Sequence, residues 1–156
     1  KGMKTLNIIR ILIVALLAVT IGTASCTKDD SLTDSQIIEE IQSNVKTGTW
    51  MITKFIDSGT DETIHFQGYN FTFGSNGVLT ASNGASSYDG TWSITDSNSS
   101  DDSPDDLDFN ILFNLTNDFE DLNDDWDILA RSSTKIELID ISGGNGGTDY
   151  LTFEKN

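Results

Sequence analysis

Residues 107–115 read LDFNILFNL, and residues 88–95 read YDGTWSIT. In both stretches large apolar side chains alternate with polar ones, so one face of the segment is apolar and the other is polar. Alternation over eight or nine residues indicates a β-strand with one buried face. The same pattern recurs through the chain beyond Thr49 and therefore decides the predicted fold.

This pattern predicts eight strands in sequence. They are expected at residues 50–56, 64–73, 78–82, 88–95, 107–115, 126–132, 135–141 and 149–154. Gly68 shifts the alternation of the second segment by one residue, as a β-bulge would. The connections are short, which favours antiparallel pairing of neighbouring strands.

Eight sequential strands with one apolar face predict an all-β fold. The expected architecture is an eight-stranded antiparallel up-and-down barrel with a short N-terminal helix, because closing the sheet removes both of its edges. A barrel of this size has an interior just wide enough for side chains or one small ligand. A sandwich of two packed sheets is the competing architecture, and the alternation alone does not distinguish the two.

A short helix is predicted before the first strand, at residues 32–46. Thr33 at the N-cap and Gln36 three positions later form a capping-box pair. Gly48 follows the helix and marks its end. The apolar stripe of this helix consists of Ile37, Ile38, Ile41 and Val45, which recur at helical spacing.

The first 25 residues have the composition of a secretion signal. Three basic residues, Lys1, Lys4 and Arg10, precede an apolar run at residues 11–21, which reads ILIVALLAVTI. A membrane-spanning helix needs about 20 apolar residues, so this run of eleven fits a cleaved signal better than a permanent span. The predicted organisation is a signal peptide at 1–25, a tether at 26–33 and the barrel domain at 34–156.

Residues 23–26, TASC, resemble the bacterial lipobox, with Thr23 in place of the usual leucine. The resemblance implies that the thiol of Cys26 is joined to diacylglycerol, that the chain is cut before Cys26 and that the new amine is acylated. The partner of the N-terminus would then be an outer-membrane lipid. An ordinary signal peptide with an incidental cysteine is the alternative.

Lys28, Asp29 and Asp30 follow the cysteine closely. A lysine and two acids at this position resemble the surface-export signal of Bacteroidetes lipoproteins. The resemblance implies a lipid-anchored protein of the outer membrane that is exposed at the cell surface. The alternative is a merely solvated tether.

The charge of the chain is strongly negative, with 9 Lys and Arg against 25 Asp and Glu and a net charge of −16. Loss of the first 25 residues removes three bases and no acid, which takes the net charge to −19. Such a surface repels phosphate backbones, so no nucleic-acid partner is expected. The chain has one cysteine, which excludes an intramolecular disulfide.

No constellation of catalytic or metal-binding residues is found. His65 is the only histidine, and on the polar face of the second strand it is read as a solvated side chain. Calcium-loop spacing begins at Asp96 and at Asp121, but both stretches lack the glycine and the glutamate that complete such a loop. We therefore expect no enzyme activity, no cofactor and no metal site.

The segment from Gly48 to the end is similar to the lipocalin-like lipoproteins of Bacteroidetes. The similarity lies in the motifs GTW at 48–50, FTF at 71–73, NG at 76–77, GTWSI at 90–94, DWDIL at 125–129, IEL at 136–138 and LTF at 151–153. It implies a lipocalin/calycin-like barrel in which Trp50 plugs the closed end. Arg131 and Lys135 are the candidates for a basic residue packed over that tryptophan.

The resemblance also implies a monomer that binds a small, mostly apolar ligand in the barrel. The expected interior ligand-binding residues are Trp50, Phe71, Phe73, Tyr88, Trp92, Phe109 and Trp126. The alternative is that these rings fill the barrel as plain core and that the protein is an accessory protein acting through protein–protein contacts. An open apolar mouth of about 300 Å³ or more would favour ligand binding.

Overall fold

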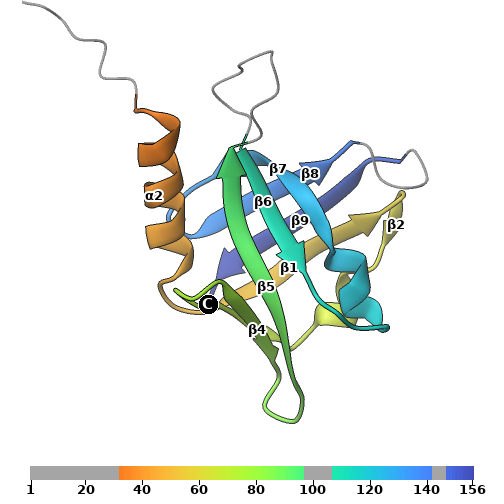
Figure 1. Ribbon diagram of the computed structural model, residues 1–156. Helices are drawn as coiled ribbons and strands as arrows, with labels where there is room; N and C mark the ends of the chain where they lie inside the picture. Colours follow the sequence, from red (N-terminus) through yellow and green to blue (C-terminus); the bar gives the residue numbers. More distant parts are fainter. Residues whose placement is uncertain (1–31, 97–106, 142–146) are drawn as a thin grey trace, which may run out of the picture. The chain divides into compact units, whose positions relative to one another are not determined.

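The computed structural model describes residues 32–96, 107–141 and 147–156 (Figure 1). Cys26, Lys28, Asp29, Asp30 and the predicted signal peptide lie outside the described residues. The elements in chain order are α2 (Asp34–Val45), β1 (Trp50–Asp57), β2 (Thr60–Asp61), the 3₁₀ helix η1 (Thr63–Phe66), β3 (Asn70–Phe73), β4 (Val78–Ser82), β5 (Ser87–Asp96), β6 (Leu107–Leu112), the 3₁₀ helix η2 (Asp118–Leu122), β7 (Asp124–Arg131), β8 (Lys135–Asp140) and β9 (Asp149–Lys155).

The strands form one closed ring, which confirms the predicted barrel and excludes the sandwich. From β3 to β9 each strand pairs antiparallel with the next, and β1 pairs with both β3 and β9. The seam between β1 and β9 carries six residue pairs, from Trp50↔Lys155 to Ile56↔Tyr150. The two-residue strand β2 stands outside the ring as a hairpin arm on β1. Eight strands therefore make the barrel.

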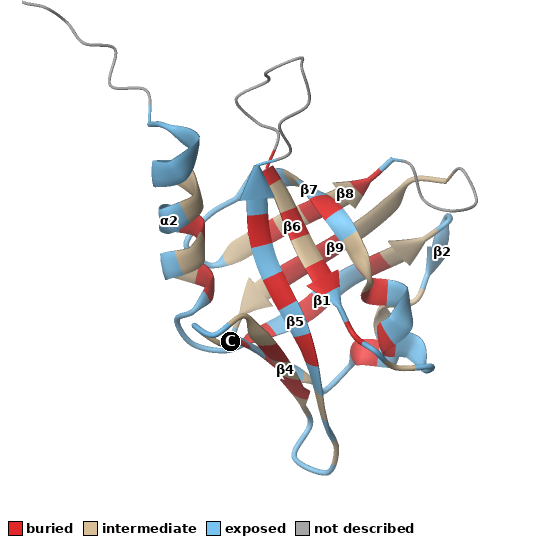
Figure 2. Cartoon of the chain, in the orientation of Figure 1, coloured by how far each residue is buried: buried red, intermediate tan, exposed pale blue. Residues whose placement is uncertain are grey.

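The alternation of the sequence sorts side chains between the interior and the solvent. Figure 2 shows buried and exposed residues alternating along β5. The interior is filled by aromatic rings in edge-to-face contact around Phe73, whose ring centroid lies 5.3 Å from that of Trp92 and 5.5 Å from that of Phe153. Such rings bury large apolar areas and add favourable quadrupole interactions.

The helix α2 lies at the end of the barrel where β1 begins. Its capping box forms as predicted, since the Thr33 side chain accepts from the Gln36 backbone and the Gln36 side chain accepts from the Thr33 backbone. Val45 is buried, and its carbonyl accepts a 2.9 Å hydrogen bond from the indole of Trp50. Within the described part of the chain, no helix combines the length and the apolar character that crossing a membrane requires.

A lysine from the last strand packs over Trp50. The Nζ of Lys155 lies 4.8 Å from the centroid of the Trp50 ring. The same ammonium donates hydrogen bonds to Asn44 Oδ1 at 3.0 Å, Thr47 Oγ1 at 2.9 Å and the Ser133 carbonyl at 2.9 Å. One charge therefore joins β9, the end of α2 and the turn between β7 and β8.

Arg131 and Lys135, the candidates from the sequence, do not take this position. Arg131 lies 3.3 Å from Glu40, and Lys135 lies 2.7 Å from Glu137. Lys155 takes the position over Trp50 because these two residues are paired in the register of β1 and β9. The sequence pattern does not give this register.

The prediction of a single second strand at 64–73 was wrong. Residues Thr63–Phe66 form η1, and Gly68, with a φ of 85°, lies in the turn between η1 and β3 and not in a continuous strand. The amide of Tyr69 donates to the carbonyl of Phe66 at 3.1 Å and closes this turn. Phe66 is buried although it does not lie on a strand. In the sequence, a buried apolar residue at this spacing looks like part of an alternating strand.

One strand boundary and one short helix also differ from the prediction. The strand expected at 107–115 ends at Leu112. The acidic stretch that follows contains η2, in which Asn117 caps the first turn by accepting from the Phe119 amide. Phe119 and Leu122 are buried against the barrel. Their burial is the reason why so polar a stretch is ordered.

We predict that Lys155→Met lowers the free energy of unfolding by about 1–2 kcal/mol, because it keeps the aliphatic stem but removes the charge over Trp50 and the hydrogen bonds. Urea denaturation measures this change. Lys155→Arg, which keeps a cation and several donors, should retain most of the stability. Equal stability of the methionine variant and the unmodified protein would show that the lysine does not hold this end together.

Candidate functional site

The predicted interior residues lie together in the barrel, where they contact one another. Six of the seven are buried and Tyr88 is partly exposed. Phe73 and Phe109 lie 5.6 Å apart between ring centroids, and Trp92 stacks on Phe109 at 6.0 Å. These rings form the core of the barrel, and their assignment to a ligand stays a prediction.

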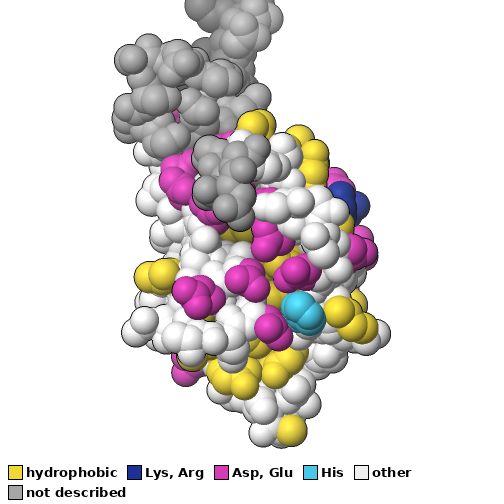
Figure 3. Space-filling view, turned by 90° about the vertical axis from the view of Figure 1, so that its right-hand side faces the viewer, with side chains coloured by type: hydrophobic (Ala, Val, Ile, Leu, Met, Phe, Trp, Pro, Cys, Tyr) yellow, Lys and Arg dark blue, Asp and Glu magenta, His cyan; other side chains and the backbone are white. Residues whose placement is uncertain are grey.

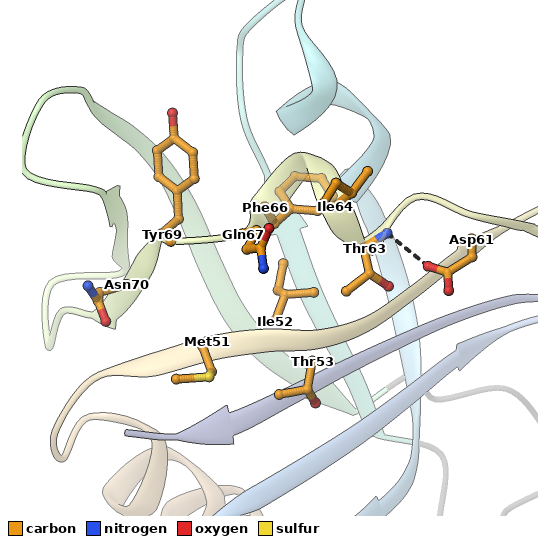
Figure 4. A pocket seen from close by; sticks show the side chains of 11 residues that line it. Met51, Ile52, Thr53, Asp61, Thr63, Ile64, Phe66, Gln67, Tyr69 and Asn70 are labelled. Atoms are coloured by element: carbon orange, nitrogen blue, oxygen red, sulfur yellow. Dashed lines mark hydrogen bonds between the residues drawn. The ribbon is translucent and has the colours of Figure 1, made fainter.

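A cavity of about 750 Å³ opens instead at the side of the barrel, between β1 and the segment from η1 to β3 (Figure 4). We call it the side slot. Its lining comes from Met51, Ile52 and Thr53 of β1 and from Asp61, Thr63, Ile64, Phe66, Gln67, Gly68, Tyr69 and Asn70. It lies close to the core because Ile52 and Phe66 are both core residues.

The side slot exists because β1 and β3 share a single residue pair, Trp50↔Phe71. Beyond this pair the chain on the β3 side leaves the sheet through the turn at Gly68. The two sides meet again at Phe55, whose amide donates to Thr63 Oγ1 at 2.8 Å and whose carbonyl accepts from the Glu62 amide at 3.0 Å. Residues 51–54 of β1 therefore lie along an opening in the barrel wall.

The backbone of Ile52 faces this opening. In an antiparallel ladder, successive residues direct their N–H and C=O groups to opposite sides. The Asn156 amide donates to the Thr49 carbonyl on the β9 side, so the backbone groups of Trp50 and Ile52 point to the β3 side. Trp50 has Phe71 as its partner there, whereas the strand pairings of the described residues give Ile52 none on that side.

The side slot combines an apolar floor with a partly polar rim. Ile52 and Phe66 form the floor, and Met51 and Ile64 are large apolar residues that remain exposed at its edge. The exposed fraction of Ile64 is 67%. An exposed apolar side chain beside a hollow is typical of a binding site.

Carboxylates gather at the end of the side slot where β1 and β2 meet. Figure 3 shows acidic side chains over this face of the molecule. Asp61 lines the slot, and its pKa is lowered by hydrogen bonds from Thr63, whose amide donates to the carboxylate at 3.1 Å. Asp61 therefore remains ionised at neutral pH and gives this end of the slot a negative charge.

Further acids lie beside Asp61. The pKa of Asp121 is raised, first by partial burial and then by the charges of Glu62, Asp57, Asp118 and Glu120. These side chains therefore share one strongly negative face. Among the described residues, no group of three or more His, Cys, Asp or Glu is arranged to hold a metal ion.

His65 lies on η1, whereas the sequence pattern predicts it on the polar face of a strand. It is exposed, and its Nδ1 lies 3.6 Å from Glu62 Oε2. Neither side chain lines the side slot. The hydroxyl of Thr63, which does line it, donates to the Phe55 carbonyl and is held within the fold. The absence of catalytic chemistry remains a prediction.

Sequence reasoning missed the residues of the side slot. Met51 and Ile64 were read as ordinary strand positions, and Gln67 received no role. The signal that could have located the slot is Gly68, where the alternation is interrupted. In the structure, this interruption marks a break in the pairing of β1 with β3 and not a β-bulge.

A second hollow, of about 540 Å³, lies over β5, β6 and the start of β7. Asp124 lines it, and the pKa of this carboxyl is raised to about 6. Partial burial is the main cause, and the interaction with the Asp125 side chain and the charge of Asp140 add to it. A hydrogen bond from the Asp125 amide, at 2.9 Å, opposes the shift.

We predict that Asp124→Asn stabilises the protein at pH 7 and not at pH 4. The folded state holds the Asp124 proton more tightly than the unfolded state, where the pKa is near 3.8. The resulting stabilisation is complete below about pH 4 and is lost as the pH rises through about 6. The asparagine variant should therefore gain stability on the order of 1 kcal/mol at pH 7, after allowance for partial exposure.

Urea denaturation between pH 4 and pH 7 measures this difference. Asp89→Asn, at an exposed position on the outer face of β5, is the matched control and should follow the unmodified protein. A pH dependence of Asp124→Asn that runs parallel to that of the unmodified protein would contradict the shifted pKa.

The chain was compared with known proteins at three levels. No family model matches it, and no curated protein is significantly similar to it in sequence. Among solved structures it is similar to a DUF4847 family protein from Bacteroides vulgatus ATCC 8482, with 19% sequence identity and a TM-score of 0.47. The match covers 74% of this chain and 97% of that chain.

Proposed function

We propose that this protein is a non-catalytic binding module with a lipocalin-like barrel, and that its ligand site is the side slot. The observation that carries the proposal is the slot itself, a hollow of about 750 Å³ with an apolar floor. Its volume falls in the range of about 300–1,000 Å³ that is usual for small-molecule sites. The filled interior supports this location, because a ligand inside the barrel would have to displace packed rings.

The apolar part of the slot fits a small, mostly apolar molecule. Burial of its apolar surface against Met51 and Ile64, which are exposed at the rim, would provide most of the affinity. Gln67 could orient its polar atoms, since it lines the slot and is exposed. The size of the hollow and the apolar floor together support one ligand of this kind.

We further propose that the module is anchored to the outer membrane by lipid on Cys26 and is displayed at the cell surface as a monomer. The lipobox-like residues 23–26 and the following Lys28, Asp29 and Asp30 support this placement. Several acyl chains, at about 0.8 kcal/mol per buried methylene, would make such an anchor effectively permanent. The side slot would then be available to molecules outside the cell.

We predict that the purified protein binds the uncharged apolar dye Nile red in the side slot. Ile64→Ser should weaken binding roughly fivefold, a loss of about 1 kcal/mol, because it removes an apolar contact at the rim. Fluorescence titration measures the affinity. Since Ile64 is exposed in the free protein, the substitution should leave folding intact.

The matched control is Ile141→Ser. Ile141 is the same residue type, has an exposed fraction of 66% and does not line the side slot. This variant should bind the dye like the unmodified protein. Equal weakening by both substitutions, or no dye binding by the unmodified protein, would overturn the proposed site.

We also predict that Cys26→Ala abolishes anchoring in the native host. Without the thiol no diacylglycerol can be attached, so the protein should move from the detergent phase to the aqueous phase on Triton X-114 partitioning. Ser25→Ala keeps a small residue before the cysteine and should remain in the detergent phase. Retention of Cys26→Ala in the detergent phase would exclude this cysteine as the anchor.

A further inference from the structure

We propose that the side slot accepts an extended, basic peptide segment, which adds to the barrel as a strand along residues 51–54 of β1. This inference rests on the proposed function, because it takes the slot to be a binding site. It goes further by naming a peptide as the ligand and the open edge of β1 as the feature that recognises it.

β1 has an open edge beside the slot. Four residues of this strand lie between its pairing with Phe71 and its contacts with Thr63. The register with β9 shifts between Ile52 and Lys54, so at about 3.3 Å per residue this stretch is at most about 13 Å long, enough for about three residues of an extended peptide. Ile52 presents the N–H and C=O groups that such a peptide would pair with. Addition of a strand to an exposed sheet edge is a common mode of peptide recognition.

The apolar residues of the slot favour a particular pattern of side chains in the peptide. Side chains of an extended peptide alternate between two sides. In the slot, one side would face the floor at Ile52 and Phe66, and the other would face the rim and the solvent. The structure therefore favours a peptide in which apolar residues alternate with polar ones.

The negative charge at the end of the slot indicates that the polar residues of the peptide are basic. Asp61 lines the slot, Glu62 follows it directly, and Asp121 shares the negative face with Glu62. Lys54 is close enough for its charge to act on Asp61, and its Nζ lies 4.4 Å from the centroid of the Tyr150 ring on β9. This one cation stands against the three acids. An acidic peptide would meet repulsion at this end of the slot, whereas lysine or arginine would be attracted.

A purely apolar small molecule would use only part of this site. It would cover the exposed apolar surface of Met51 and Ile64, but it would leave the backbone groups of Ile52 unpaired and would make no use of the negative charge of Asp61. An extended peptide satisfies all three features. Peptide binding thus accounts for more of the slot than its apolar floor alone.

The test uses the purified protein and a fluorescently labelled peptide, acetyl-Lys-Val-Lys-Val-Lys-amide. Fluorescence anisotropy gives its affinity, and the peptide with Glu in place of Lys is the charge control, expected to bind at least about tenfold more weakly. Two further peptides carry N-methyl groups on the valines or on the lysines. Because only one set of amides faces β1, one analogue should lose about tenfold in affinity and the other should lose little.

Variants of the protein test the same contacts. Asp61→Asn with Glu62→Gln should weaken binding of the basic peptide severalfold, whereas Glu39→Gln with Glu40→Gln removes the same charge from α2 and should have little effect. Ile64→Ser should weaken the peptide and Nile red alike, since both would contact the rim.

The outcomes separate this inference from the proposed function. If Nile red binds in the slot and the basic peptide does not, the peptide inference fails and the small-ligand site stands. If neither binds, both fail. If both N-methylated peptides bind as tightly as the unmodified peptide, strand addition is overturned. If the acidic peptide binds as tightly as the basic one, the preference for a basic peptide is overturned.

Discussion

Pairing of the first strand with the last holds this barrel together. β1 and β9 close the ring along six residue pairs, and the first of them brings Lys155 over Trp50. The ammonium group also ties α2 and the turn between β7 and β8 to the same end. Because β1 is bound so firmly to β9, it can lose most of its pairing with β3 without opening the barrel. The side slot exists because β1 shares six residue pairs with β9 but only one with β3.

The core and the slot have different roles. Aromatic rings around Phe73 fill the interior, and the hollow lies at the side of the barrel. Gly90 belongs to the same dense packing, since a Cβ there would lie 2.7 Å from the Phe113 ring. The slot has exposed apolar residues and a backbone edge that is not paired with β3. A strongly negative face lies beside it.

Much of the fold could be predicted from local pattern. The capping box at Thr33 and the strand at Val78–Ser82 appear where the sequence placed them, because each depends on neighbours along the chain. The errors fall at η1 and η2. There Phe66, Phe119 and Leu122 are buried by contacts with distant strands, and a short helix can present a buried residue at the same spacing as a strand. Lys155 was missed for the same reason, since its partner Trp50 is more than a hundred residues away.

The sequence by itself determined the all-β class, the number of barrel strands, the N-terminal helix and the negative charge, because periodicity and composition are properties of neighbouring residues. It also supplied the prediction of an anchored N-terminus through Cys26. The tertiary structure alone decided that the rings fill the interior, which lysine covers Trp50 and where the barrel wall opens. Those features depend on the register between β1, β3 and β9. The register of strands that lie far apart in the sequence cannot be predicted from patterns of neighbouring residues.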